Sequence, residues 1–216
     1  MISLHTHSLL SDGDLLPWEL ARRAEVKGYK YLGITDHVDD SNIEEVALNT
    51  IKVCNEINKF FKIKVIAGVE ITHVSPEHIP KLAKEARDIG IKLIVVHGET
   101  IVEPVKPGTN FAALNSNIDI LAHPGFITKK EVELAKKRGI MLELTTRKGH
   151  SLTNGYVAKL ALEVGATLIL NTDAHSPDDL ITYDFAVKVV RGAGLSLSQE
   201  KKVFKNSYNF VKEVLK

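Results

Sequence analysis

The stretch Leu93-Ile94-Val95-Val96 is an unbroken apolar run that ends directly at His97. A second run, Thr167-Leu168-Ile169-Leu170, has the same character and leads into Thr172-Asp173-Ala174-His175. Strands that are covered on both faces read as continuous Val, Ile and Leu, whereas half-exposed strands alternate apolar with polar residues. The two runs therefore predict buried strands of a parallel sheet, each followed by polar side chains that can carry chemistry.

Seven short apolar segments of this kind alternate with longer amphipathic stretches along the chain. The predicted strands are 2–4, 29–34, 63–69, 91–96, 118–121, 140–144 and 167–170. The predicted helices, in which apolar residues recur three and four positions apart, are 15–26, 43–60, 76–89, 129–138, 154–164 and 178–190. Residues 198–216 predict two further short amphipathic helices at the bottom or edge of the barrel. The alternation of strand and helix predicts an α/β protein with a parallel sheet.

Length and composition fit a single enzyme-sized domain. The chain has 216 residues, of which 44% are hydrophobic and 25% charged, enough to bury a full core. No change of composition and no Pro/Gly linker divides it, so we expect one domain over residues 1–216. Lys and Arg number 28 against 27 Asp and Glu, so no global charge attracts the protein to nucleic acid or anionic lipid.

The cellular compartment is predicted from the single cysteine and from the N-terminal residues. Cys54 has no partner for an internal disulfide, and residues 1–4 lead straight into the first polar motif without a basic or long apolar leader. No apolar run reaches the roughly 18 residues that a membrane span needs. We therefore expect a cytoplasmic protein that does not enter a membrane.

Histidines and carboxylates follow every predicted strand. The candidates are His5 and His7 with Asp12, Asp36 and His37, Glu70, His97, His123, Glu143, and Asp173 with His175. The carboxyl ends of parallel strands meet at one mouth of a barrel, and active sites concentrate there. We therefore expect these side chains to converge at a single site.

The mixture of side chains at this site is suited to metal ions. Neutral imidazole nitrogens and carboxylate oxygens are ligands for Zn, Mn and Fe. In the pairs His5-x-His7 and Asp173-x-His175, both side chains face the same side of an extended chain. Two cations about 3.5–4 Å apart, bridged by one carboxylate, can bind the attacking and leaving oxygens of a phosphoryl transfer. The pattern predicts a multinuclear metal centre.

These segments resemble the motifs of the PHP (polymerase and histidinol phosphatase) family. The resemblance rests, in chain order, on His5-Thr6-His7 with Ser11-Asp12-Gly13, Thr35-Asp36-His37, Gly68-Val69-Glu70, His97, Ala122-His123-Pro124-Gly125 and Thr172-Asp173-Ala174-His175. It spans nearly the whole chain. It implies a distorted (β/α)7 barrel, in agreement with the seven predicted strands, and up to three divalent metal ions at the C-terminal mouth of those strands.

The resemblance also implies how the ligands divide between the ions. One ion would be bound by His5, His7, Glu70 and Asp173, a second by Glu70, His97 and His123, and a third by Asp12, His37 and His175. Glu70 would then bridge two ions. Some family members have a histidine where this chain has Asp12. Occupancy of the third site and the identity of the metal, whether Zn, Mn or Fe, therefore stay open.

The mechanism that we expect is in-line attack on phosphorus by a metal-activated hydroxide. Asp173 would orient the hydroxide, and His175 or His37 would protonate the leaving alkoxide. The irregular loops 98–110 and 145–153 are candidate substrate loops. The second contains Arg147, Lys148 and His150 as candidate substrate-binding residues. Arg147 is preferred for phosphate because its planar guanidinium binds two oxygens at once.

The resemblance leaves the phosphate ester open. A small phosphomonoester is preferred, with histidinol phosphate, a compound of histidine biosynthesis, as the named example. The alternative is a nuclease or nucleotide phosphoesterase that acts on 5′-phosphorylated ends, although the near-zero net charge argues against long nucleic-acid contacts. A non-catalytic metal-binding scaffold is a third interpretation, and the complete set of ligands argues against it. The oligomeric state cannot be predicted.

Other polar residues have simpler interpretations. We expect Asp36 to cap the turn that follows it rather than to bind a metal ion. Glu143 is expected either to hold a liganding ring in place or to form an ordinary ion pair. His73 is expected to line the pocket or, preferably, to make a local hydrogen bond in its loop. His78 is expected to be solvated.

Overall fold

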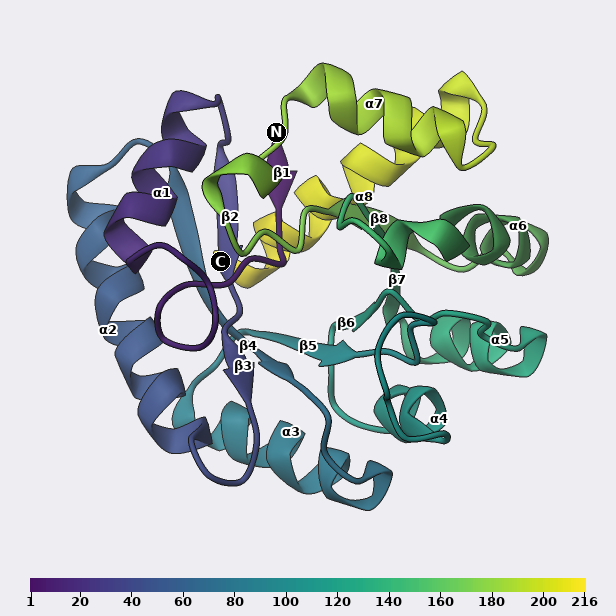
Figure 1. Cartoon of the computed structure of the whole chain (residues 1–216), viewed down its shortest axis with the longest axis horizontal. Coiled ribbons are helices and arrows are strands. Elements are labelled where there is room, and N and C mark those ends of the chain that lie inside the picture. Colours follow the sequence, from purple (N-terminus) through teal and green to yellow (C-terminus); the bar gives the residue numbers. More distant parts are fainter.

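The computed structural model describes residues 1–216, and its strands surround a central axis with the helices outside them (Figure 1). The strands are β1 (Ile2–Ser3), β2 (Tyr31–Ile34), β3 (His37–Val38), β4 (Lys64–Ile71), β5 (Leu93–His97), β6 (Ile120–Ala122), β7 (Met141–Thr145) and β8 (Leu168–Asn171). Their order is β1-β2-β4-β5-β6-β7-β8, all neighbours are parallel, and β3 pairs with β4. The predicted barrel and its seven strands are confirmed. Strand β3 was not predicted, because two residues are too few to show a pattern.

The barrel closes between β1 and β8 through bonds at the strand ends. Thr6 forms a parallel bridge with Ala174, and the backbone N–H of His7 donates to the Ala174 carbonyl at 2.8 Å. The Asp173 N–H donates to the His5 carbonyl at 2.9 Å. These bonds join the first and last motifs of the chain, so residues at opposite ends of the sequence share one site.

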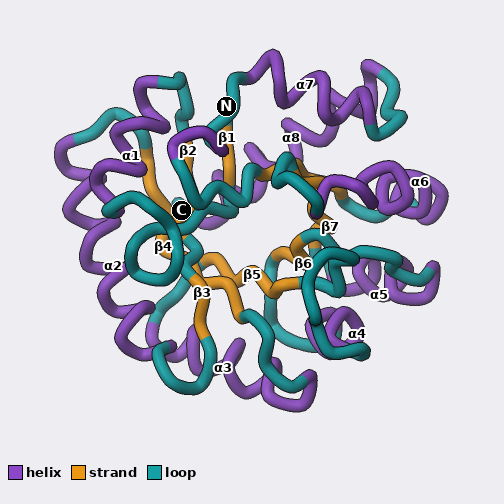
Figure 2. The backbone as a smooth tube through the Cα atoms, viewed as in Figure 1, coloured by secondary structure: helices purple, strands orange, loops and turns teal.

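The helices surround the strands, except the C-terminal one, which crosses behind the barrel (Figure 2). They are α1 (Pro17–Val26), α2 (Ile43–Phe60), α3 (Ile79–Ile89), α4 (Thr109–Leu114), α5 (Lys129–Arg138), α6 (Asn154–Val164), α7 (Tyr183–Gly192) and α8 (Leu197–Val214), with short 3-10 turns η1 (Pro76–His78), η2 (His150–Thr153) and η3 (Pro177–Asp179). The bounds of α2, α5 and α6 coincide with the predicted ones. None of the helices has a stretch long and apolar enough to cross a membrane.

One helix was missed and one helical prediction is wrong. Helix α4 begins in the last two residues of the expected loop 98–110 and continues to Leu114, over residues for which no element was predicted. The C-terminal segment forms one helix of 18 residues instead of two short ones. Its start is fixed by a capping box between Ser196 and Gln199, and no Gly or Pro interrupts it afterwards. Val211 of α8 packs into the apolar cluster inside the barrel, so this helix closes the bottom of the barrel, opposite the strand carboxyl ends.

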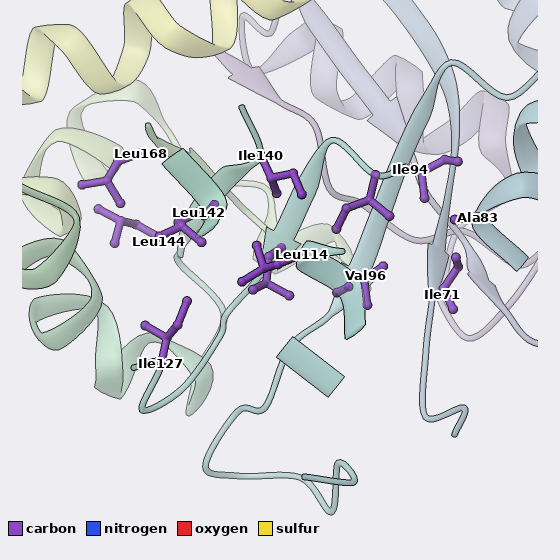
Figure 3. Close-up of a cluster of buried hydrophobic side chains, with 14 of the residues drawn as sticks. Ile71, Ala83, Ile94, Val96, Leu114, Ile127, Ile140, Leu142, Leu144 and Leu168 are labelled. Atoms are coloured by element: carbon purple, nitrogen blue, oxygen red, sulfur yellow. The ribbon is translucent and has the colours of Figure 1, made fainter. Parts of the chain in front are cut away.

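The core has an inner layer inside the barrel and an outer layer between sheet and helices. The run Leu93–Val96 contributes side chains to both layers. Ile94 and Val96 point outward into the cluster between sheet and helices (Figure 3), while Leu93 and Val95 fill the barrel interior. Burying each such side chain contributes about 1.5–3 kcal/mol. Gly33 and Gly68 make room for Leu93, because a Cβ on Gly33 would lie 2.6 Å from Leu93 Cδ2 and one on Gly68 2.8 Å from its carbonyl oxygen.

Candidate metal centre

Glu70 lies at the middle of a group of histidines at the carboxyl ends of the strands. Its Oε2 is 3.2 Å from His5 Nε2, 3.5 Å from His7 Nε2 and 2.9 Å from His37 Nδ1. Its Oε1 is 3.9 Å from His123 Nε2. Strand β4 places this carboxylate inside the barrel, because Ile66 faces inward and every second residue after it does the same.

Asp173 shares the same centre from the opposite side of the barrel. Its Oδ1 is 3.2 Å from His7 Nε2 and 3.6 Å from His5 Nε2, and its Oδ2 is 3.6 Å from His123 Nε2. The His97 ring stands edge-on to the His123 ring, with 4.4 Å between their centroids. The residues of the first two predicted ligand sets are therefore gathered in one buried cluster.

Asp12 lies above this cluster, at the entrance. Its Oδ1 is 3.4 Å from His175 Nε2, 3.6 Å from His37 Nε2 and 4.0 Å from His7 Nδ1. The loop that carries Asp12 folds tightly against His7, and a Cβ at Gly13 would lie 2.4 Å from the His7 carbonyl oxygen. The structure thus brings together the third predicted set, although the Asp12 side chain is 56% exposed.

Backbone conformation contributes to this arrangement. The only non-glycine residues with positive φ are His73, His123 and Asp173, at 52°, 24° and 50°, and all three lie at the mouth. In β6, Leu121 faces outward and Ala122 inward, so a regular strand would point His123 away from the centre. The change of φ at His123 turns its ring inward instead. Such strained conformations persist where the surrounding structure enforces them.

The donor atoms of the centre fit metal ions because many of them are buried without any hydrogen-bond partner. They are Nε2 of His5, both ring nitrogens of His7, Nδ1 of His37, both carboxylate oxygens of Glu70 and Nδ1 of His123. Leaving such atoms unpaired costs free energy, and a coordinated cation would remove that cost. Among the residues of the centre, four groups have their donor atoms within 4.8 Å of one another: His5/His7/Glu70, His5/His123/Asp173, Glu70/His97/His123 and His7/Asp12/His37/His175.

Electrostatics at the centre favour neutral rings of His7 and His123 beside an ionised Glu70. Burial and the neighbouring His37 hold the pKa of His7 well below its ordinary value, and burial and His97 do the same for His123. Burial opposes ionisation of Glu70, but His5 and His37 outweigh it and lower its pKa well below normal. Neutral imidazole and ionised carboxylate are the forms that bind metals.

His5 differs from these two rings. Burial disfavours its charged form, but the carboxylates of Glu70, Glu143 and Asp173 outweigh burial and raise its pKa well above the ordinary value. Burial raises the pKa of Asp173. Positive charge is thus favoured at the point where these carboxylates meet, which is the electrostatic condition for binding a cation.

Glu143 and Asp36 support the centre without facing its cavity. Glu143 Oε2 accepts from His5 Nδ1 at 2.8 Å, so it holds a predicted liganding ring, the first of its two expected roles. The expectation for Asp36 is wrong in part, because it caps no following turn. Its carboxylate instead accepts hydrogen bonds from the Ser8 N–H, the Ser8 hydroxyl and the Ser11 hydroxyl, at 2.7–2.8 Å. Asp36 therefore anchors the preceding loop, which carries Asp12.

A cavity of about 200 Å³ lies over the centre, and no hydrophobic residue lines it. Arg147 and His150 border this cavity, whereas Lys148 borders only the wider depression of about 620 Å³ outside it. Arg147 Nη1 contacts Asp179 Oδ2 at 3.2 Å. The loop 145–153 thus reaches the site as expected. Within it, Arg147 faces the inner cavity, whereas Lys148 is more exposed and lies outside it.

Glu103 is the ionisable cavity residue that sequence reasoning missed. It lies in the loop 98–110, which was predicted to contact substrate, but it follows no strand directly and no motif contains it. Hydrogen bonds with His150 and His97 hold its pKa below the ordinary range. His73 borders the same cavity and also makes the expected local contact, 2.7 Å from Nδ1 to Thr72 Oγ1. His78 is exposed, as expected, and contacts Asp40 Oδ2 at 3.0 Å.

Fold and site together define a parallel α/β-barrel protein with a clustered histidine–carboxylate centre at the C-terminal mouth. The PHP domain model matches residues 3–100 of the chain. An uncharacterized protein of Methanocaldococcus jannaschii is 48% identical over 98% of this chain and 97% of its own. The chain belongs to the PHP domain family.

More distant relatives carry functional names. A probable phosphatase of Thermoanaerobacter sp. is 27% identical over all of this chain and 94% of its own. The DNA polymerase/3′-5′ exonuclease PolX of Bacillus subtilis is 28% identical over 80% of this chain but only 34% of its own. A solved amidohydrolase superposes with a TM-score of 0.64 at 10% identity, over all of this chain and 73% of its own, which shows the shared barrel fold.

Proposed function

We propose that the protein is a metal-dependent phosphoesterase that hydrolyses a small phosphomonoester. The proposal rests on the buried imidazole and carboxylate atoms that lack partners at the mouth of the barrel. They lie beneath a polar cavity whose one lysine or arginine is Arg147. Membership of the PHP domain family and the probable phosphatases among the relatives support the same class of reaction.

Three groups of residues would hold the metal ions. The first is His5, His7, Glu70 and Asp173, the second Glu70, His97 and His123, and the third Asp12, His37 and His175. Divalent ions bound there supply positive charge for the phosphoryl oxygens and lower the pKa of a coordinated water. The mixture of imidazole and carboxylate suits Zn, Mn or Fe.

Arg147 would bind the phosphate of the substrate. Its side chain is 28% exposed at the cavity, with Nη1 held 3.2 Å from Asp179 Oδ2 and Nε 4.0 Å from Asp173 Oδ2. A guanidinium held in this way presents its remaining N–H groups to two phosphoryl oxygens. Lys148 and His150 would contribute further contacts, Lys148 from the rim and His150 from the cavity wall.

Three residues of the centre would handle protons. Asp173 would accept a hydrogen bond from the attacking water and so align it with phosphorus. His37 and His175 both border the cavity and would protonate the leaving alkoxide when the third group holds no ion. With an ion in the third group, both rings would be ligands, and the proton would come from solvent.

The cavity favours a small, polar substrate. A nucleobase is bound mainly by stacking on aromatic or apolar groups, and the inner cavity has no hydrophobic wall. A long nucleic acid would need several clustered cations, whereas Arg147 is the single lysine or arginine here. Histidinol phosphate is the first substrate to test, and a 5′-phosphorylated nucleotide or oligonucleotide end is the alternative.

The experiment is hydrolysis of a generic phosphomonoester by the purified protein. Activity should disappear with a chelator and return with Mn or Zn. Histidinol phosphate, nucleoside monophosphates and 5′-phosphorylated oligonucleotides are then compared at equal metal concentration, and kcat/KM should be highest for a small phosphomonoester. Preference for the oligonucleotide would favour the nuclease alternative. No hydrolysis with any metal would favour a non-catalytic scaffold and contradict the proposal.

A further inference from the structure

Glu103 contacts three imidazoles at the entrance of the cavity. Its Oε2 lies 2.9 Å from His97 Nε2 and 3.7 Å from His73 Nε2, and its Oε1 lies 3.3 Å from His150 Nε2. We call these four residues the outer cluster. Only His97 belongs to a ligand group of the proposed centre. His73 and Glu103 have no role so far and need an explanation of their own.

The three rings of the outer cluster are oriented alike. In each, Nδ1 lies against an oxygen of its own surroundings: the Gly98 carbonyl for His97 at 3.1 Å, Thr72 Oγ1 for His73 at 2.7 Å, and Thr100 Oγ1 for His150 at 2.9 Å. Each ring then directs Nε2 at Glu103. A carbonyl can only accept, so Nδ1 of His97 carries a proton. Nε2 donates to Glu103 when the ring is charged, and it offers a lone pair to an ion when the ring is neutral.

This orientation is typical of histidines that bind metals. Such a histidine donates from one ring nitrogen to a neighbouring oxygen, and this fixes the ring while the other nitrogen faces the ion. The donor atoms of His73, His97 and Glu103 lie within 4.8 Å of one another. Positive φ at His73 also holds its ring over the entrance. Two imidazoles and one carboxylate, with a fourth position open to the cavity, form a donor set suited to Zn²⁺.

We propose that His73, His97 and Glu103 form an outer site for a divalent transition-metal ion, which shares only His97 with the three groups of the centre. His150 acts as a positioning residue that holds the second oxygen of Glu103. His97 has only one free ring nitrogen, so an ion in the outer site competes for it with an ion held by Glu70 and His123. The side chains of His73 and Glu103 are 41% and 38% exposed. The outer ion therefore binds more weakly than the ion of the buried first group, which does not use His97.

The test is a calorimetric titration of the chelator-treated protein with Zn²⁺. The wild type should show tight binding to the buried first group, which does not use His97, followed by a distinct weaker phase as the outer site fills. The variants His73→Ala and Glu103→Gln should each weaken that phase by roughly tenfold to a hundredfold or more, and the tight phase should remain. His78→Ala is the matched control. His78 is an exposed histidine that contacts a carboxylate, Asp40, away from the cavity, and its loss should change neither phase.

A wild-type titration without a weaker phase would overturn the inference. So would a weaker phase that keeps its affinity in both variants. The readout is binding of Zn²⁺ and involves no turnover, so the outer site is tested even if no phosphoester is hydrolysed. Hydrolysis with an unaltered titration in the variants would contradict the outer site alone.

Discussion

Glu143 Oε2 lies 2.8 Å from His5 Nδ1, and both side chains are completely buried. The same oxygen accepts a hydrogen bond from Asn171 Nδ2 at 2.8 Å. These contacts fix the His5 ring so that Nε2 faces Glu70, 3.2 Å away. A carboxylate behind a liganding imidazole increases the basicity of the ring and sets its tautomer. Glu143 would thus be a positioning residue for the proposed metal centre.

Glu143→Gln should lower the affinity of the centre for Zn²⁺ by roughly tenfold to a hundredfold, because the neutral amide no longer supports the His5 ring. The dissociation constant, measured with a competing chelator, checks this. Glu163→Gln is the control, since Glu163 is exposed and pairs with Lys129 on the helical surface. Equal affinities for wild type and Glu143→Gln would show that the contact has no role in metal binding.

Arg147→Ala should reduce kcat/KM for a phosphomonoester by roughly tenfold to a hundredfold, since a hydrogen bond to a charged group contributes about 1.5–3 kcal/mol. Lys148→Ala should have a smaller effect, because Lys148 borders only the outer depression. Steady-state kinetics of the two variants distinguish these positions. A larger loss for Lys148→Ala would mean that phosphate binds at the rim instead of in the inner cavity.

Asp36→Ala should lower the free energy of unfolding by about 1–3 kcal/mol, because the donors of Ser8 and Ser11 lose their acceptor. Urea denaturation measures the change. Asp39→Ala is a matched control: Asp39 accepts in a similar way from the N–H and hydroxyl of Ser41 but is exposed, so the variant should stay within about 0.5 kcal/mol of wild type. If both variants lost similar amounts of unfolding free energy, Asp36 would have no special structural role.

Cys54 should make the protein less stable at alkaline pH. Burial raises the pKa of this thiol to about 12, whereas the thiol of an unfolded chain has a pKa of about 8.5. Between these values the folded state retains a proton that the unfolded state releases, so stability falls as pH rises, by up to about 1.4 kcal/mol per pH unit. Urea denaturation from pH 8 to 10.5 should show a shallower fall for Cys54→Ala. If the stability of wild type and of Cys54→Ala fell equally with pH, the raised pKa of the buried thiol would be contradicted.

Most of the fold could be predicted because strands covered on both faces leave a strong pattern. The runs 93–96 and 167–170 lie within the strands β5 and β8 or directly beside them, and helices α2, α5 and α6 have the predicted bounds. The C-terminal segment was wrongly predicted as two helices, because amphipathic spacing alone does not show where one helix ends and another begins. Strand β3 was missed because its pairing with β4 is a tertiary contact.

The candidate site was predictable to the extent that its residues follow strands. His97 is the last residue of β5, and Glu70 lies near the end of β4. Glu103 lies in a loop, and nothing in the local sequence shows that it folds back onto His97. Asp36 was predicted to cap the turn that follows it. Its actual contact, with Ser8, joins loops that follow different strands, and the local sequence does not show such a contact.

The most direct test of the metal centre is Glu70→Gln, because Glu70 contacts His5, His7, His37 and His123 at 2.9–3.9 Å. Bound metal and phosphomonoesterase activity are measured on the same samples, with Asp40→Asn, an exposed carboxylate beside His78, as the control. We predict that Glu70→Gln loses metal and activity together while the control keeps both. Full turnover by Glu70→Gln, or full metal content without any change in activity, would contradict the bridged metal centre.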